Sequence, residues 1–110
     1  MGPRRQMETS MSKHVIECVL FRLVEGTNPS AFTKAAEDLN AWVAGQPGFI
    51  ARSLSCTEDG EWIEHIEWKS MEDAKAVAAK IGQAEEAGAF IRAIDGSSVT
   101  MRHAMLEVTA

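Results

Sequence analysis

The chain has 110 residues, a length that fits one domain and lets folding bury roughly 65% of the surface exposed by the unfolded chain. Hydrophobic residues make up 45% and charged residues 25%, which is typical of an ordinary soluble globular protein and excludes a disordered or membrane-embedded one. The net charge is -5 and both signs are scattered along the chain, so the basic stripe that a nucleic acid partner requires is missing.

Cysteine usage and the N-terminal residues bear on the compartment. Cys18 and Cys56 each fall in a predicted strand without a second thiol or histidine at ligand spacing, so we interpret them as reduced core residues rather than a disulfide or metal site. No signal peptide is recognisable, and no run approaches the ~18 apolar residues of a membrane span. We predict a cytoplasmic protein with no membrane partner, a disordered leader at residues 1–12 and one folded domain at residues 13–110.

The first predicted elements are a strand and a helix. From Lys13 to Leu23 the residues are β-rich and apolar on both parities, which predicts a central strand buried on both faces. Asn28 followed by Pro29 predicts a helix start, because the Asn side chain can accept from a free amide and proline at the first position gives up no needed donor. Apolar residues recur at helical spacing to about Ala44, and Gly45-Gln46-Pro47-Gly48 ends the helix.

A predicted hairpin follows. Its first arm is Phe49 to Thr57, and the turn at Asp59-Gly60 makes the second arm antiparallel to it. In the second arm bulky residues alternate with charged ones, and each face mixes apolar bulk with acid, so neither face is plainly solvent-facing. One face holds Trp62, Glu64, Ile66 and Trp68, and the other holds Ile63, His65 and Glu67.

A second helical region and a last strand complete the chain. Ser70-Met71-Glu72-Asp73 has capping-box character, with Asp in the usual place of Glu. Apolar residues then continue at helical spacing, and Gly82 and Gly88 are expected to interrupt or bend the region, which splits it in two. Ser97 to Glu107 is the last predicted strand.

The predicted order β-α-β-β-α-β is that of a ferredoxin-like α+β fold, with both helical regions on one face of a four-stranded antiparallel sheet. The opposite face stays open, and its apolar patch is too large to be comfortable in a monomer. We therefore predict a homodimer that packs sheet to sheet. The residues placed on this patch are Ile16, Cys18, Leu20, Ile63 and Ala104.

Three segments carry a resemblance to a known family. They are Gln46-Pro47-Gly48-Phe49-Ile50, Ile66-Glu67-Trp68-Lys69-Ser70-Met71-Glu72 and Ser98-Val99-Thr100-Met101-Arg102-His103. On these the chain, from about His14 to Val108, resembles the dimeric α+β barrel superfamily and, within it, the proteins similar to antibiotic biosynthesis monooxygenases (ABM). The resemblance implies a dimeric barrel and a chemistry that ranges across the superfamily from oxygenation to no known reaction.

The resemblance also implies site residues. Members that oxidise aromatic substrates or haem have an Asn on the first strand, a Trp ending the third, and a His on the following helix or a Tyr nearby. Trp68 matches the Trp. Val19 or a neighbour stands where the Asn would be, the helix after Trp68 has no His, and the chain has no Tyr. Haem degradation is therefore not expected.

The residues themselves point to a site on the helix-facing side of the sheet. If the first and third strands are a parallel central pair, Glu17 lies near Glu64 on one side and His103 on the other. A carboxylate desolvated against tryptophan has a raised pKa and can exchange a proton, with His103 as its relay. We predict catalytic roles for Glu17, Glu64 and His103 and ligand-binding roles for Trp68, Trp62 and Phe21, with no metal and no cofactor.

Each of these residues also has a purely structural interpretation. Tryptophans are more often packing residues than catalysts, and a strand glutamate is commonly solvated or salt-bridged. A buried His103 opposite an acid satisfies its need for a partner without any chemistry. The residue types alone therefore do not establish a reaction.

These observations predict a homodimeric, monooxygenase-like protein that binds a small aromatic or quinone-type molecule between sheet and helices, as a cofactor-independent enzyme. One alternative is a non-catalytic small-ligand-binding or stress-responsive barrel, and another is a dimeric structural module with a filled core. A cavity beside Trp68 that is reached from solvent would favour the first two over the third.

Overall fold

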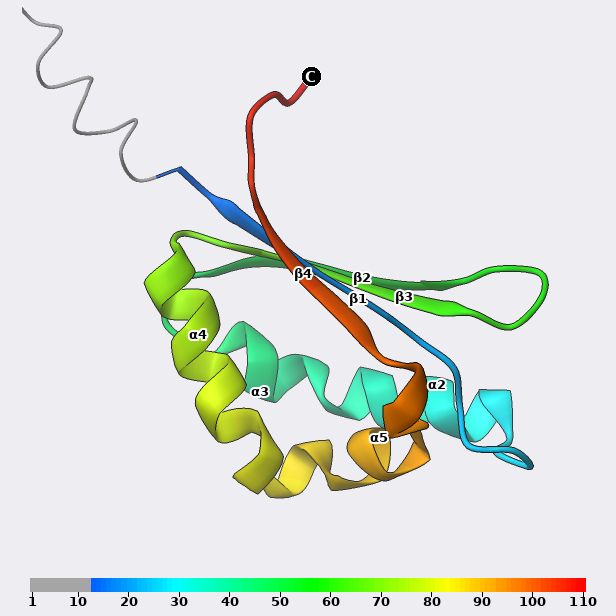
Figure 1. The fold of residues 1–110 in the computed structure, drawn as a ribbon. Helices are drawn as coiled ribbons and strands as arrows, with labels where there is room; N and C mark the ends of the chain where they lie inside the picture. The colour runs from blue at the N-terminus through cyan, green and yellow to red at the C-terminus, as the bar shows by residue number, and fades with distance from the viewer. Residues whose placement is uncertain (1–12) are drawn as a thin grey trace, which may run out of the picture.

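The computed structural model describes residues 13–110, so the predicted leader lies outside the described residues. These residues form a four-stranded antiparallel sheet in the order β2-β3-β1-β4, with the helices on one face (Figure 1). This confirms the predicted ferredoxin-like α+β class. The strands are β1 (Val15–Phe21), β2 (Phe49–Cys56), β3 (Trp62–Trp68) and β4 (Thr100–Met105). The α-helices are α2 (Pro29–Asp38), α3 (Asn40–Ala44), α4 (Met71–Lys80) and α5 (Gly88–Ala93).

The direction of the central strand pair differs from the expectation. β1 and β3 were expected to run parallel, and they are antiparallel. The reason is the crossover through α2 and α3, which places β2 parallel to β1 but one strand away from it. The hairpin partner β3 fills the gap between them and runs in the opposite direction. β4 also pairs antiparallel with β1, on its other edge.

Local side-chain caps explain where the helices start. The Asn28 side-chain oxygen accepts hydrogen bonds from the amides of Ser30 and Ala31 at 2.8 and 3.1 Å, as the Asn-Pro pair predicted. Ser70 Oγ accepts from the Asp73 amide at 3.1 Å, which starts α4 at the predicted capping box. The first helix is broken at Leu39 into α2 and α3.

The later half of the helical region is split, as expected from its glycines. Two short 3₁₀ turns, Ile81–Gln83 and Glu85–Ala87, separate α4 from α5. A third, Gly96–Ser98, follows α5 and is capped by Asp95, whose Oδ1 accepts from the Ser97 amide at 3.0 Å. Because this turn takes residues assigned to the last strand, β4 is shorter than predicted.

The core lies between the sheet and the helices, and β1 alternates across it. Val15 and Phe21 are fully buried under the helices, while Ile16, Cys18 and Leu20 point the other way and are only half-buried. The expectation that this strand is buried on both faces is therefore wrong for the single chain, because all helices cover the same side (Figure 1). Other fully buried side chains are Phe32, Leu39, Val43 and Trp68.

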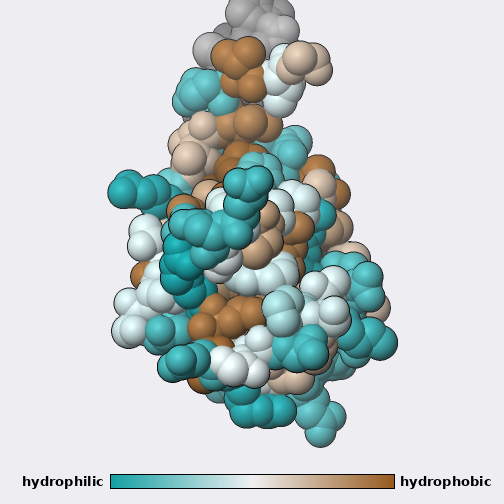
Figure 2. All heavy atoms as spheres, turned by 90° about the vertical axis from the view of Figure 1, so that its right-hand side faces the viewer, coloured by the Kyte–Doolittle hydropathy of each residue, from teal (hydrophilic) through white to brown (hydrophobic). Residues whose placement is uncertain are grey.

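The strand register confirms the composition of the open face. Leu20 pairs with Ile63, and Ile16 pairs with Ala104, so the apolar patch predicted for this face is contiguous across three strands. Figure 2 shows the end of the molecule at the β2–β3 hairpin. The surface there is mostly hydrophilic, and the hydrophobic side chains on it form separate small groups.

The two cysteines differ from the core residues that the sequence predicted. Both thiols are free, but Cys18 is half-buried on the open face and Cys56 is exposed at the end of β2. Cys18 lies on the sheet face that carries no helix, whereas Cys56 shares the helix-facing side with Trp62 but lies at the hairpin end of the strand. Within residues 13–110, no helix is long and apolar enough to cross a membrane.

Candidate functional site

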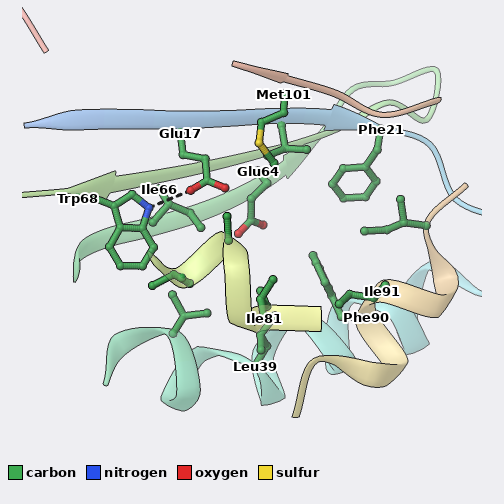
Figure 3. Close-up of a pocket in the computed structure, with 15 residues that line it drawn as sticks. Glu17, Phe21, Leu39, Glu64, Ile66, Trp68, Ile81, Phe90, Ile91 and Met101 are labelled. Carbon is green, nitrogen blue, oxygen red and sulfur yellow. Dashed lines mark hydrogen bonds between the residues drawn. The ribbon is translucent and has the colours of Figure 1, made fainter. Parts of the chain in front are cut away.

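A cavity of about 200 Å³ lies between the helix-facing side of the sheet and the later helices (Figure 3). Its walls are aliphatic and aromatic except for two glutamates. The lining residues that matter below are Glu17, Phe21, Glu64, Trp68, Ile91 and Met101. The filled volume expected of a purely structural module is therefore not found here.

The cavity reaches the surface between α5 and β4. Ile91 on α5 and Met101 on β4 both line it, and their side chains are 40% and 48% exposed. Large apolar side chains on the surface carry a hydration cost, and here they form the rim of an opening. A molecule from solvent can thus reach the cavity across an apolar rim.

Glu17 is the first acid of the cavity, and its partner is Trp68. The indole Nε1–H of Trp68 donates to Glu17 Oε1 at 3.0 Å, and both side chains are buried. Glu17 lies on β1 and points down into the cavity, as Figure 3 shows. A hydrogen bond to a charged acceptor offsets part of the cost of burying the carboxylate.

His103 lies next to Glu17, directly opposite it in the β1–β4 register. His103 Nε2 is 3.8 Å from Glu17 Oε1, too long for a hydrogen bond but close enough for an ion pair when the imidazole is protonated. This nitrogen is buried and makes no hydrogen bond. His103 does not line the cavity itself, so a bound ligand would contact Glu17 and not His103.

Glu64 is the second acid, and its partner is a buried arginine. Arg52 Nε donates to Glu64 Oε2 at 2.7 Å and Arg52 Nη2 to Glu64 Oε1 at 3.3 Å, a two-pronged contact between side chains that are 5% and 8% exposed. Burial raises the pKa of Glu64 and the nearby Glu17 carboxylate raises it further, while Arg52 opposes both. The net direction is upward because removal from water outweighs the ion pair.

Arg52 is tied to the helices as well as to Glu64. Its Nη1 donates to the Ala36 carbonyl and to Asn40 Oδ1, both at 2.8 Å. The guanidinium also lies 5.4 Å from the centre of the Phe90 ring. One side chain on the edge strand thus connects the second acid to three helices.

No family model matches this chain, and no curated protein matches it. Solved structures do. A variant of SnoaB, a cofactor-independent oxygenase from Streptomyces nogalater, superposes with a TM-score of 0.72 at 18% identity, over 88% of this chain and 96% of that one. A monooxygenase from the ActVA-Orf6 gene of Streptomyces coelicolor, in complex with nanaomycin D, gives 0.65 at 17% identity, over 91% and 93%.

The chain has the fold of these monooxygenases. A dimeric ferredoxin-like protein of unknown function from Thermobifida fusca is also similar, with a TM-score of 0.68 at 9% identity over 86% of this chain and 92% of that one. The resemblance to ABM-like dimeric α+β barrels is thereby confirmed at the level of the fold. At these sequence identities the structural similarity shows a shared fold only, and the chemistry has to be inferred from the side chains of the site.

Most of the predicted site residues come together. Glu17, Glu64, Trp68 and Phe21 all line the cavity, and His103 stands behind Glu17. Although the parallel direction assumed for β1 and β3 is wrong, the antiparallel register still pairs Val19 with Glu64, one residue pair away from Glu17 on the same face.

Trp62 is the exception, because it does not line the cavity. It begins β3 at the hairpin end of the sheet, and its ring meets Phe32 edge to face with centroids 4.9 Å apart. There it borders a separate hollow beside α2.

Sequence reasoning missed Arg52. β2 has an irregularity between Phe49 and Ala51, where the register against β3 shifts by one residue. Strict alternation from Phe49, which packs against Trp68, would send Arg52 to the open face. The bulge turns it inward instead. The only signal was that Arg52 shares parity with Leu54, an apolar residue on the same strand.

Proposed function

We propose that this protein is a homodimeric, cofactor-independent monooxygenase that oxidises a small hydroxylated aromatic molecule bound in the cavity. The observation that carries this proposal is the pair of buried carboxylates, Glu17 and Glu64, facing an otherwise apolar cavity beside Trp68. Apolar sites with a few convergent polar groups are typical of small-molecule binding, and paired acids are typical of proton transfer.

The polar groups of the cavity favour a hydroxyl-bearing ligand. Ionised carboxylates only accept hydrogen bonds, and the Trp68 N–H is already used by Glu17. A phenol or hydroquinone can donate to them, whereas a quinone has only acceptors. Of the two ligand types predicted from the sequence, the hydroxylated aromatic therefore fits better.

The cavity volume favours a small ring system. An apolar cavity of about 150 Å³ is enough for benzene, whereas drug-sized ligands occupy about 300 Å³ or more. At about 200 Å³ this cavity suits one or two fused rings. Its apolar rim at Ile91 and Met101 suits passage of such a molecule.

In the proposed reaction a carboxylate takes the phenolic proton, and the resulting electron-rich phenolate transfers one electron to O₂. The superoxide and the aryloxyl radical combine at the ring carbon opposite the oxygen, and the peroxide takes a proton. The O–O bond then breaks and the ring hydrogen leaves, which yields a quinone and water. One O₂ is consumed; one of its atoms enters the product and the other becomes water.

Glu17 and His103 are suited to the proton transfers in this scheme. Glu17 accepts one indole hydrogen bond and faces the cavity, and His103 lies opposite it on β4, the neighbouring edge strand. A proton taken by Glu17 can pass to the imidazole, because its Nε2 lies 3.8 Å from Glu17 Oε1 and makes no hydrogen bond within the described residues. Glu64 supplies the second acceptor for the ligand hydroxyl.

The fold neighbours support oxygenation, since two of those named above are described as oxygenases and one holds a ligand. The homodimer is supported by the apolar open face and by the dimeric neighbour of the same fold. Packing two such faces together would bury Leu20 and Ile63 from both copies. We further propose that the dimer works in the cytoplasm, where Cys18 and Cys56 stay reduced.

The test is oxygen uptake by the metal-free protein with a panel of one- and two-ring phenols that carry a hydrogen on the ring carbon opposite the hydroxyl. We expect uptake above the buffer rate and one ¹⁸O atom in the quinone when the gas is ¹⁸O₂. Glu17→Gln should abolish the acceleration, while Glu37→Gln, a change on the exposed side of α2, should leave it intact. Uptake that is equal in buffer and enzyme would overturn the proposal.

A second candidate is a non-catalytic binder of the same ligand class. It is favoured by the engagement of both acids with fixed partners, Trp68 and Arg52, since a carboxylate held in place by protein donors suits recognition as well as catalysis. Quenching of tryptophan fluorescence by the phenols without oxygen uptake would establish this function and exclude the oxygenase.

A further inference from the structure

Arg52 is a charged side chain in a place where a charge is costly. It is 5% exposed, and it lies beside the Phe90 ring under α5. A buried charge persists only when it is paired and its donors are satisfied. Arg52 meets this condition through Glu64 and through two acceptors on the first helical segment, the Ala36 carbonyl and Asn40 Oδ1.

The N–H donors of the Arg52 guanidinium bind two different sets of acceptors. Nη1 is held by the helices, whereas Nε and Nη2 are directed at the two oxygens of Glu64. Because a guanidinium is planar, fixing Nη1 also fixes the direction of the other two donors. The Glu64 carboxylate is therefore oriented by a group that is itself anchored at its far end.

The other acid of the cavity has no such anchor. The groups that face the pair are Arg52 from β2, Trp68 from β3 and His103 from β4, and only the first carries a permanent charge. The helices add apolar side chains to this side of the cavity. Without Arg52, Glu64 would face Glu17 across an apolar space, and no other lysine or arginine of residues 13–110 lies beside it.

We propose that Arg52 is a positioning residue that holds the Glu64 carboxylate aimed at the ligand hydroxyl, while Glu17, beside His103, receives the ligand proton. Its role in turnover rests on the proposed function, but its effect on Glu64 does not. In the reaction Glu64 would accept the ligand hydroxyl throughout, and Glu17 with His103 would receive the proton.

The experiment follows the side-chain carboxyl carbons of ¹³C-labelled glutamate by NMR as pH changes, in the full chain without ligand. Arg52→Met keeps the length of the stem and removes the charge. We expect the titration midpoint of Glu64 to rise by about 1 to 3 pH units, since a close opposite charge depresses a carboxyl by that much. Glu17→Gln and Glu64→Gln assign the two signals.

Two further variants keep the test decisive if Arg52→Met does not fold. Arg52→Lys retains the charge without the planar fork, and Asn40→Ala removes one anchor of Nη1. Both should raise the Glu64 midpoint, by less than the methionine change. An unchanged midpoint in every variant that folds would overturn the proposal and leave Arg52 as a packing residue.

A ligand measurement adds a readout that damage to packing would not move. In Arg52→Met the affinity for 1-naphthol should fall at least tenfold at pH 7 and recover at higher pH, where Glu64 ionises. Loss of affinity at every pH would contradict the proposal. If oxygen uptake fails in the wild type while the Glu64 midpoint still depends on Arg52, only the oxygenase function is lost.

Discussion

Trp68 and Glu17 come from neighbouring strands and share one buried hydrogen bond, with 3.0 Å between the indole nitrogen and the carboxylate oxygen. Neither residue is opposite the other in the register, since Trp68 pairs with Val15 and Glu17 with Ile66. The bond therefore runs diagonally across the strand pair on the helix-facing side. It closes one end of the cavity and holds the first acid in place.

Removing this donor should weaken the fold and free the acid. Trp68→Phe keeps most of the ring packing but deletes the N–H, so the free energy of unfolding should fall by about 2 kcal/mol, the usual effect of losing a hydrogen bond to a charged group. Urea unfolding measures the loss. Trp42→Phe, at a half-buried position packed against the core, is the matched control. Equal losses in both variants would show that ring size, not the hydrogen bond, matters.

Glu64 gives a prediction about pH. Its pKa in the folded protein is raised from the ordinary 4.5 by burial, so the folded state binds the Glu64 proton more tightly than the unfolded state does. The Glu64 contribution to stability should therefore be highest below pH 4.5 and fall as pH rises through the folded-state pKa. Glu64→Gln cannot titrate and should lack this fall.

Urea unfolding of both proteins between pH 4 and pH 7 tests this directly. The unfolding free energy of Glu64→Gln minus that of the wild type should increase with pH over this range. A difference that decreases would mean that the Arg52 ion pair outweighs burial and that the pKa of Glu64 is lowered.

The fold could be predicted because its signals are local. The Asn28-Pro29 cap, the Asp59-Gly60 turn and the alternation from Trp62 to Trp68 each depend on neighbouring residues, and together they define the element order. The site could be predicted in part for the same reason. Glu17 and Trp68 lie on faces that strict alternation assigns correctly.

What could not be predicted depends on contacts between distant elements. Arg52 points inward because of a bulge in β2, and no residue of that strand is typical of a bulge. The antiparallel direction of β1 and β3 follows from the path of the crossover. Trp62 and Trp68 face the same side of the sheet but lie at opposite ends of β3. Only Trp68 therefore lines the cavity.

Filling the cavity should block binding without unfolding the protein. Ala78 on α4 lines the cavity, so Ala78→Phe places a ring in the space where the ligand would bind. We expect the affinity for 1-naphthol to fall at least tenfold, about 1.4 kcal/mol, while the urea midpoint stays unchanged or rises. Ala79→Phe, on the same helix but outside the lining, should bind normally. Isothermal titration calorimetry distinguishes the two variants.

The open sheet face predicts the assembly. Leu20 and Ile63 pair at one end of its apolar patch, and a charge placed there in both copies of a dimer would be buried without a partner. Leu20→Lys should therefore convert a dimer into a monomer in sedimentation equilibrium at micromolar concentration. Val24→Lys, at an exposed loop position, should remain dimeric. A wild-type chain that sediments as a folded monomer would disprove the sheet-to-sheet dimer.

The acceptor-only polar lining predicts which of two near-identical ligands binds. 1-Naphthol and 1-methoxynaphthalene have the same ring system, but only the first can donate a hydrogen bond to Glu17 or Glu64. A hydrogen bond to a charged acceptor is worth about 1.5 to 3 kcal/mol, so naphthol should bind roughly ten to a hundred times more tightly. Glu64→Gln should narrow that ratio, because an amide can also serve a ligand that only accepts. Equal affinities for the two compounds in the wild type would mean that the carboxylates do not face the ligand.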